Sequence, residues 1–264
     1  MADHTIPAAI LDALQRADPS WRPALVAGLD AMMAATPDYL PALAADQYLP
    51  TGGRLFAAFA LPLDAVRYVL VGEGPYPREE SATGVCFMDG AVGPLWSETG
   101  LSKPVNRATS LRNFMKMLLV ADGRLAADDT GGAALAPIAK AAQTTEAKTT
   151  IQMLPELQEN LLGRGFLLLN AALVFRKHVP PVQEARAWVP FQRAVFGALA
   201  ARDDKPTLVL WGKIAEQLKN VPETAGFPQI HAEHPYNLSF IRHEGMQRLF
   251  GPMHLLRRGG RRTS

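Results

Sequence analysis

The stretch Arg67-Tyr-Val-Leu-Val71, followed at once by Gly72-Glu-Gly-Pro-Tyr-Pro77, decides the fold of this chain. Its first five residues are almost continuously apolar, which is typical of a strand buried on both faces of a sheet. Two similar runs and one weaker run follow later in the chain: Gly165-Phe-Leu-Leu-Leu169, Thr207-Leu-Val-Leu-Trp211 and Gln229-Ile-His231. These four runs predict four strands.

Apolar residues at three- and four-residue spacing precede and separate these runs, and this spacing predicts helices. The predicted helical segments are residues 6–43, 110–119, 152–162, 188–201 and 213–220. Alternation of strands and helices favours a parallel sheet with helices on both faces. We therefore predict an α/β fold with three α/β/α layers around a central, mostly parallel four-stranded sheet.

We predict that residues 1–264 form a single domain, with two segments outside the regular pattern. Residues 121–150 are rich in Ala, Gly, Asp and Thr, and we expect a surface insertion without chemistry. Residues 257–264 contain four arginines among glycines, and we expect a basic flexible tail. The alternative for this tail is a non-specific phosphate contact, whose affinity would fall steeply with salt. The four arginines are Arg257, Arg258, Arg261 and Arg262.

The composition is that of a globular protein, with 48% hydrophobic and 20% charged residues. The net charge of +2 is not that of a strongly basic nucleic-acid binder. No apolar run reaches membrane-spanning length and no secretory signal pattern opens the chain, so we expect no membrane partner. The single cysteine, Cys86, allows no internal disulfide and no cysteine-ligated zinc or iron–sulfur site, which favours a cytoplasmic location.

The loop after the first strand is a candidate site, because ligands of open α/β sheets bind beyond the carboxyl ends of the strands. Gly72-Glu-Gly is not a dinucleotide-binding fingerprint, because Pro77 occupies the third glycine position and a second proline interrupts the loop. The prolines instead make the loop rigid and hold Glu73 in place. Glu73 is either a functional carboxylate or a structural one that is paired with Arg78 or Arg176.

Three further residues near strand ends could act on a planar, polar ligand. Asn170 has both a donor and an acceptor with which to bind the edge of a cyclic imide, or it caps the next segment. Phe87 either belongs to the core or stacks on a planar ring. His234 precedes a proline, which favours an extended backbone, and a single loop histidine is often structural.

Taken together, these positions resemble the uracil-DNA glycosylase superfamily, and most closely its family 1. The family motif G-Q-D-P-Y-H reaches G-L-C-F after six residues, and this chain reads Gly72-Glu-Gly-Pro-Tyr-Pro77 and then Gly84-Val-Cys-Phe87 in the same register. The resemblance extends over about residues 20–255. The family patterns L-L-L-N, L-L-W-G, H-P-S-P-L-S and a serine-bearing helix start match Leu167-Leu-Leu-Asn170, Leu208-Val-Leu-Trp-Gly212, His234-Pro-Tyr-Asn-Leu-Ser239 and Ser110-Leu-Arg-Asn113.

The resemblance implies a role for each matching residue in the excision of uracil flipped out of DNA. Phe87 would stack on the uracil, and Asn170 would hydrogen-bond its O4 and N3 edge. Tyr76 would exclude the methyl group of thymine, and His234 would donate to O2 of the leaving base. Leu238 would enter the duplex where the base left.

The resemblance also implies the substrate and the remaining contacts. The substrate would be uracil-containing DNA, single- or double-stranded, and the protein would act as a monomer without a metal or other cofactor. Gly74 would belong to the substrate-binding residues, together with Tyr76, Phe87 and Asn170. The DNA contacts would come from Ser110, Tyr236, Asn237, Leu238 and Ser239.

The chain departs from family 1 in its first and last motifs. Gly74 stands at the position of the family's water-positioning aspartate, Pro77 at that of its histidine, and Tyr236 at that of a serine. One explanation is a binding-only homologue, and another is a glycosylase for a different damaged base. The hypothesis that we favour is that Glu73 supplies the missing carboxylate from the neighbouring position, since family 4 carries glutamate as the second residue of its motif G-E-A-P-G. Weaker candidates, expected to face solvent, are Asp89, Glu79 and Glu80.

Overall fold

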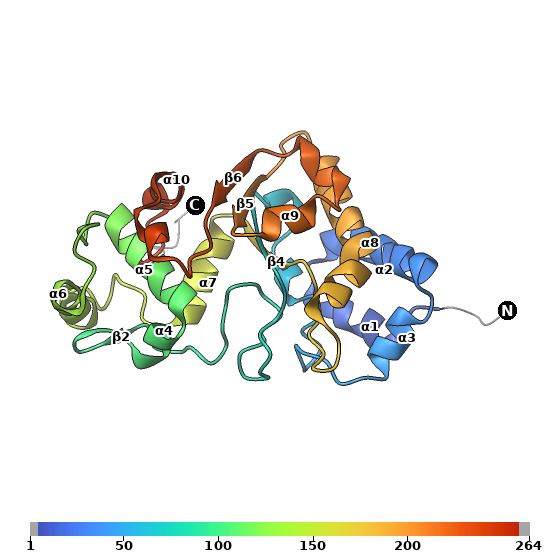
Figure 1. The fold of residues 1–264 in the computed structure, drawn as a ribbon, viewed down its shortest axis with the longest axis horizontal. Helices are drawn as coiled ribbons and strands as arrows, with labels where there is room; N and C mark the ends of the chain where they lie inside the picture. Colours follow the sequence, from blue (N-terminus) through green and yellow to red (C-terminus); the bar gives the residue numbers. More distant parts are fainter. Residues whose placement is uncertain (1–4, 259–264) are drawn as a thin grey trace. The chain divides into compact units, whose positions relative to one another are not determined.

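The computed structural model describes residues 5–258, apart from the side chains of residues 215 and 216 (Figure 1). The described chain divides into two compact units. The first contains the described residues up to Gly90 together with Gly165–Ile230, and the second contains Ala91–Arg164 and the described residues from His231 onward. That residues 1–264 form a single domain, as the sequence predicts, stays a prediction. The division arises because residues 91–164 make most of their contacts with one another and with the C-terminal segment.

The four predicted strands are present, and each lies within a few residues of its predicted position. The sheet has the order β4-β1-β5-β6, with bounds β1 Tyr68–Gly72, β4 Phe166–Asn170, β5 Thr207–Trp211 and β6 Gln229–Ala232. β1 runs parallel to both β4 and β5, and Gly72 pairs with Asn170 at its carboxyl end. The predicted α/β class, with a central parallel four-stranded sheet flanked by helices, is confirmed.

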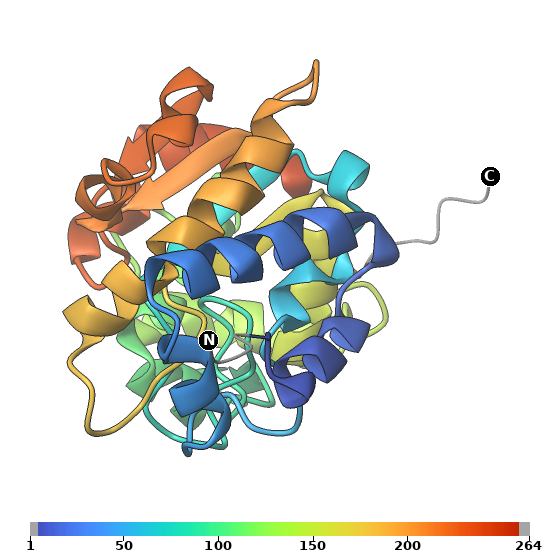
Figure 2. The same cartoon turned by 90° about the vertical axis from the view of Figure 1, so that its right-hand side faces the viewer.

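Two long helices of the first unit, α2 Arg22–Ala35 and α8 Pro181–Ala200, lie side by side (Figures 1 and 2). They approach closely at Gly28, where a Cβ atom would lie 2.8 Å from a ring carbon of Phe191. Alternate strand residues such as Val69 belong to the same buried core as both helices. Proline is tolerated in a first helical turn, so α8 begins at Pro181, well before the predicted residue 188.

The remaining elements of the first unit are short. Residues 6–43, predicted as helical, contain three α-helices with breaks between them, and residues 213–220 contain only α9. The short elements are α1 Ala8–Ala13, α3 Tyr39–Ala44, α9 Ile214–Leu218 and the 3₁₀ helices η1 Leu14–Arg16, η2 Pro19–Trp21, η3 Ala57–Ala60, η4 Leu63–Ala65 and η5 Pro222–Gly226.

The second unit is mainly helical. It contains α4 Lys103–Arg107, α5 Thr109–Ala121, α6 Gly132–Gln143, α7 Leu154–Gly163, α10 Glu244–Phe250, η6 Leu238–Arg242, η7 Gly251–Met253 and the antiparallel pair β2 Trp96–Ser97 and β3 Gly100–Leu101. The predicted insertion, residues 121–150, forms α6. Leu135, Ala139 and Ala142 of α6 are buried, and the helix packs against β2 and β3. The insertion is therefore part of the packed second unit.

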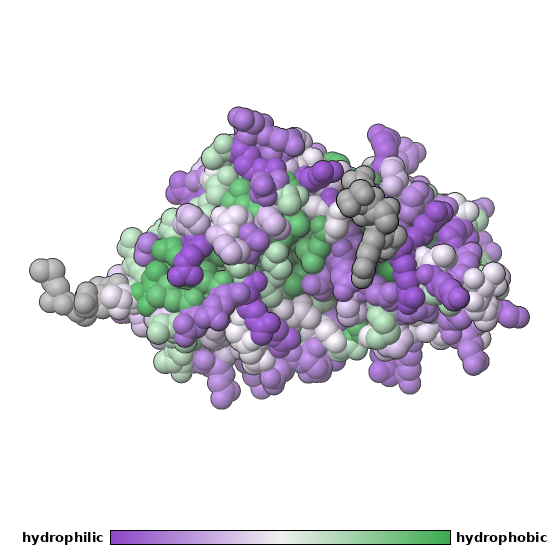
Figure 3. Space-filling view, turned by 180° about the vertical axis from the view of Figure 1, so that it is seen from behind, coloured by the Kyte–Doolittle hydropathy of each residue, from purple (hydrophilic) through white to green (hydrophobic). Residues whose placement is uncertain are grey.

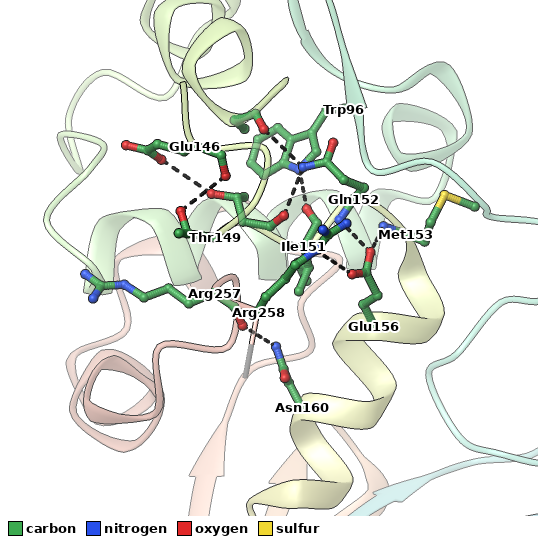
Figure 4. Close-up of polar contacts among 12 residues, drawn as sticks. Trp96, Glu146, Thr149, Ile151, Gln152, Met153, Glu156, Asn160, Arg257 and Arg258 are labelled. Atoms are coloured by element: carbon green, nitrogen blue, oxygen red, sulfur yellow. Dashed lines mark hydrogen bonds and ion pairs between the residues drawn. The ribbon is translucent and has the colours of Figure 1, made fainter. Parts of the chain in front are cut away.

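The start of the predicted flexible tail is bonded to the segment before α7 and to α7 itself (Figure 4). The Arg258 backbone N–H donates to the Thr149 carbonyl at 2.7 Å, and Asn160 Nδ2 donates to the Arg257 carbonyl at 2.7 Å. Arg258 Nε also donates to Glu156 Oε1 at 2.9 Å. Arg257 and Arg258 thus form hydrogen bonds with other residues of the second unit. Residues 259–264 lie outside the described part of the chain, and a flexible tail over residues 257–264 stays a prediction.

None of the described helices combines the length and the apolar character needed to cross a bilayer. Hydrophilic residues occupy much of the face shown in Figure 3, and hydrophobic residues gather there in smaller areas.

Candidate active site

The loop after β1 leaves the sheet with its backbone still tied to the chain beyond β4. The Ala171 N–H donates to the Gly72 carbonyl at 2.8 Å, and the Ala172 N–H donates to the Glu73 carbonyl at 3.1 Å. The two segments thus stay hydrogen-bonded to each other past the ends of both strands. It fixes the backbone of Glu73 at the edge of the sheet where ligands of this fold class bind.

The Glu73 side chain is exposed. Within residues 5–258 it has neither a side-chain hydrogen bond nor an ion pair. The two arginines considered as its partners are engaged elsewhere: Arg78 lies 3.8 Å from both Glu80 and Asp89, and Arg176 pairs with Glu184 and Asp46. The structural ion pair considered for Glu73 is therefore absent. Gly74 beside it is also exposed.

Asn170 lies opposite Gly72 at the end of β4 and is only 4% exposed. Its side chain needs the glycine, because a Cβ atom on Gly72 would lie 2.7 Å from Asn170 Oδ1 and 3.0 Å from Cys86 Cβ. The structure gives the Asn170 carboxamide no hydrogen-bond partner among the described residues. Buried polar groups are almost always hydrogen-bonded, so this carboxamide is well suited to receive a ligand.

Gln192 supports the end of β4 from helix α8 and was missed in the sequence. Its side chain is buried, and Nε2 donates to the carbonyls of Asn170 at 2.9 Å and of Ala171 at 3.0 Å. These bonds fix the peptide groups that follow Leu169. A polar residue on the mostly apolar buried face of α8 was the signal that could have revealed it.

Phe87 has a left-handed backbone with φ of 66°, which is unusual for a bulky side chain. Its half-buried ring meets Trp211 edge-on, with centroids 5.1 Å apart. The preceding segment is closely held: the Cys86 N–H donates to the Leu168 carbonyl at 3.1 Å, and Gly84 leaves no room for a Cβ atom, which would lie 2.2 Å from the Arg54 carbonyl oxygen. Backbone strain of this kind is typical of ligand-binding sites.

Tyr76 is half-buried in the loop after β1. Burial raises the pKa of Tyr76 to about 12, and the negative charge of Asp89 adds to this effect, so the phenol stays neutral. Asp89 is itself buried, contrary to the expectation that it faces solvent, and lies 3.8 Å from Arg78. Glu79 and Glu80 are exposed as expected.

Apart from Ser110 on α5, the candidate residues of the second unit lie in the loop that opens with His234. The Asn237 N–H donates to the His234 carbonyl at 2.9 Å, which closes a tight turn with Pro235 in its second position. The Tyr236 N–H donates to Nδ1 of His234 at 3.1 Å. A ring nitrogen that accepts a backbone N–H carries no proton, so in the neutral imidazole the proton is on Nε2.

Asn113 of α5 holds this loop from beneath. It is fully buried, and Nδ2 donates to the carbonyl of Pro235 at 2.7 Å and to that of Tyr236 at 3.2 Å. From the sequence, Asn113 was identified only as part of the motif that begins at Ser110, and no role was predicted for it. Its function as a tether depends on a contact between segments more than a hundred residues apart, which no local pattern reveals.

Ser239 closes the other end of the loop against Glu233. Partial burial alone would raise the pKa of Glu233, but a hydrogen bond from Ser239, a backbone hydrogen bond and the nearby charge of His243 outweigh it and lower the pKa. The side chains between these anchors point outward, with Tyr236 68% and Leu238 67% exposed. Asn237 is exposed as well, and Ser110 is half-buried in the first turn of α5.

The predicted site residues thus form two groups. The first lies at the carboxyl ends of β1 and β4 and in the segment packed against them, and contains Glu73, Gly74, Tyr76, Phe87 and Asn170. The second lies at α5 and the loop after β6, and contains Ser110, His234, Tyr236, Asn237, Leu238 and Ser239. Within the described residues, no group of three or more His, Cys, Asp or Glu side chains is arranged to hold a metal ion.

Comparisons with known proteins identify the family. No protein-family model matches the chain. The uracil-DNA glycosylase of Mycobacterium sp. (strain KMS) is 30% identical over 200 residues, which cover 75% of this chain and 71% of the relative, and that of Tropheryma whipplei (strain Twist) is 26% identical over 201 residues.

Solved structures agree with this assignment. The crystal structure of wild-type UNG from Nitratifractor salsuginis is 40% identical, covers 95% of this chain and 97% of its own, and superposes with a TM-score of 0.85. A mimivirus UNG variant in complex with UGI is 18% identical with a TM-score of 0.53, and shares the fold. Together with the matching residues at the strand ends, these similarities show that the chain belongs to the uracil-DNA glycosylase family.

Proposed function

We propose that this protein hydrolyses the bond between uracil and deoxyribose in DNA and leaves an abasic site, as the names of its relatives indicate for those proteins. The observation that carries this proposal is the buried carboxamide of Asn170, which has no partner among the described residues. A cyclic imide offers a matching donor at N3 and an acceptor at O4. Cytosine presents the opposite pattern and is rejected.

Two aromatic residues complete the recognition of the base. Phe87, held in a strained backbone and backed by Trp211, stacks on the planar ring of the flipped-out uracil. Tyr76 lies beside the C5 position and excludes a methyl group, which distinguishes uracil from thymine. Its phenol stays neutral, since burial keeps its pKa at about 12.

His234 stabilises the leaving group. As the bond from C1′ to N1 breaks, its electron pair moves onto the uracil ring and negative charge develops on O2. The Nε2–H of a neutral His234, set by the hydrogen bond from Tyr236 to Nδ1, donates to that oxygen. Donors that are oriented before the reaction towards developing charge are usually the largest catalytic contribution.

Glu73 supplies the carboxylate that Gly74 lacks. As uracil departs, the sugar develops positive charge, and the carboxylate of Glu73 stabilises it and orients a water molecule. The water oxygen then bonds to C1′, and its proton passes to Glu73. Exposure and the absence of an ion pair within residues 5–258 leave this side chain free to reach solvent. Because water and no protein amine attacks the sugar, the reaction stops at the abasic site.

The test is uracil release from a labelled single-stranded oligonucleotide, with alkaline cleavage to reveal abasic sites. We expect Glu73→Gln to lose more than about tenfold in kcat/KM, and Glu79→Gln, a matched exposed carboxylate, to remain at the wild-type level. Unchanged activity in Glu73→Gln would refute the role of this carboxylate. Tight binding of uracil-DNA without release by the wild type, on single or double strands, would refute the activity and indicate a binding-only homologue.

A further inference from the structure

Tyr236 combines an exposed ring with a fixed backbone. Its N–H donates to His234 Nδ1, and its carbonyl accepts from Asn113 Nδ2, so both of its peptide groups are engaged. The side chain is nevertheless 68% exposed. An aromatic ring on a rigid backbone loses little conformational entropy on binding, because only two side-chain torsions are ordered. The geometry is that of a preformed stacking surface.

Cations that form no ion pair among the described residues lie on α4 and α5, and α5 packs against η6 at the end of this loop. Residues 99–121 contain four cations and no acidic residue: Lys103, Arg107, Arg112 and Lys116. Within the described residues, none of these four forms an ion pair. Arg112 donates only to neutral acceptors, the carbonyl of Asn106 at 3.2 Å and Oδ1 of Asn113 at 3.4 Å.

Helical spacing places two of these cations beside the loop. Arg112 and Lys116 are four residues apart on α5 and share a face, and Lys116 follows Asn113, the tether of the loop, by three residues. Partial burial lowers the pKa of Lys116, and the positive charge of Arg112 lowers it further. Two neighbouring cations without an acidic partner favour the binding of an anion.

We propose that Tyr236 is a stacking platform for an unpaired nucleobase of the DNA strand, and that Arg112 and Lys116 hold phosphates of the same strand. Exposed aromatic rings combined with unpaired cations are the elements by which proteins bind unpaired nucleic acid. The choice of DNA as ligand rests on the proposed function. The tyrosine departs from the family motif that this chain resembles, which carries serine at that position.

Binding of a labelled, uracil-free oligothymidine strand tests the platform without catalysis. By fluorescence anisotropy we expect Tyr236→Ser to weaken binding about tenfold, and Tyr236→Phe, which retains the ring, to stay within about twofold of the wild type. A fully paired duplex offers no free base face, so Tyr236→Ser should weaken duplex binding by less than about twofold. Equal losses on strand and duplex, or none on either, would overturn the stacking role.

The salt dependence of the same binding tests the cations. Each lost phosphate contact lowers the slope of log affinity against log salt by about 0.7 on single strands, so we expect this decrease in Arg112→Gln and in Lys116→Gln. Lys140→Gln, which removes an exposed cation of α6, should keep the wild-type slope. Unchanged slopes in both α5 variants would refute the phosphate contacts. Because this assay uses no uracil, its outcome is independent of base release by the wild type.

Discussion

The carboxyl end of β4 and the loop that opens with His234 present functional side chains in opposite ways. At the end of β4, the key recognition residue, Asn170, is buried, and its side chain lacks a partner among the described residues. In the second, Tyr236 and Leu238 are exposed, while the backbone beneath them is tethered by Asn113. A small base is recognised by an enclosed donor and acceptor in fixed positions, as at Asn170. A long DNA strand binds to a rigid surface that is already open to solvent, as at the loop of His234.

Gly72→Ala breaks the first arrangement most severely. The new Cβ atom would lie 2.7 Å from Asn170 Oδ1 and must displace that side chain. We expect uracil release to fall by about a hundredfold or more, because misplacement by about an ångström has that effect. The matched control is Gly74→Ala, whose Cβ atom would only make ordinary contacts with Ala172, at 3.7 and 3.9 Å. Similar losses in both variants would contradict the special role of Gly72.

The double variant Glu73→Gln, Gly74→Asp tests whether Glu73 takes the place of the aspartate that family 1 carries at position 74. Position 74 has room for a side chain and no left-handed backbone, so aspartate is sterically accepted. We expect the double variant to release uracil at least about tenfold faster than Glu73→Gln alone, because a carboxylate again stands at the position of the family's aspartate. Single-turnover rates measure this directly. A double variant as slow as Glu73→Gln alone would mean that the relocated carboxylate does not explain the departure.

Asn113→Leu breaks the tether in the second group and should act mainly on DNA binding. The loop carbonyls lose their donor, and the rigid surface becomes mobile. We expect KM for uracil-DNA to rise about tenfold while kcat falls less, and steady-state kinetics separate the two. Asn160→Leu is the control, because Asn160 Nδ2 also donates to two carbonyls of the second unit, those of Leu255 and Arg257. If both variants raise KM alike, the effect is one of stability only.

Glu233→Gln has the smallest expected effect and concerns the acid stability of the second group. The pKa of Glu233 is lowered in the folded protein, so its ionised form adds stability above the ordinary value of 4.5, and this stability is lost as the pH falls below that value. We expect unfolding of the Gln variant to depend less steeply on pH between about 5 and 3. Thermal unfolding followed across this range would show it, and superimposable profiles would contradict it.

The residues that carry the family resemblance were recognisable without any coordinates. Each strand is a short, continuous run of apolar residues. The residues of that run are enough to predict a strand that is buried on both faces. Polar residues directly after such runs, such as Asn170 and Glu73, must lie at the carboxyl edge of a parallel sheet. The same reasoning placed His234, whose loop follows the weakest strand.

The tertiary structure alone decided how those residues are supported. Gln192 and Asn113 act on backbone carbonyls 21 or more residues away in sequence, and no local periodicity encodes such pairs. The exposure of Glu73 and the burial of Asp89 likewise depend on which arginine reaches which carboxylate. The sequence by itself determined the strands and the chemistry at their ends, because both are local. The packing of distant segments decided which groups are buried, tethered or open to solvent, because that depends on contacts formed only when the chain folds.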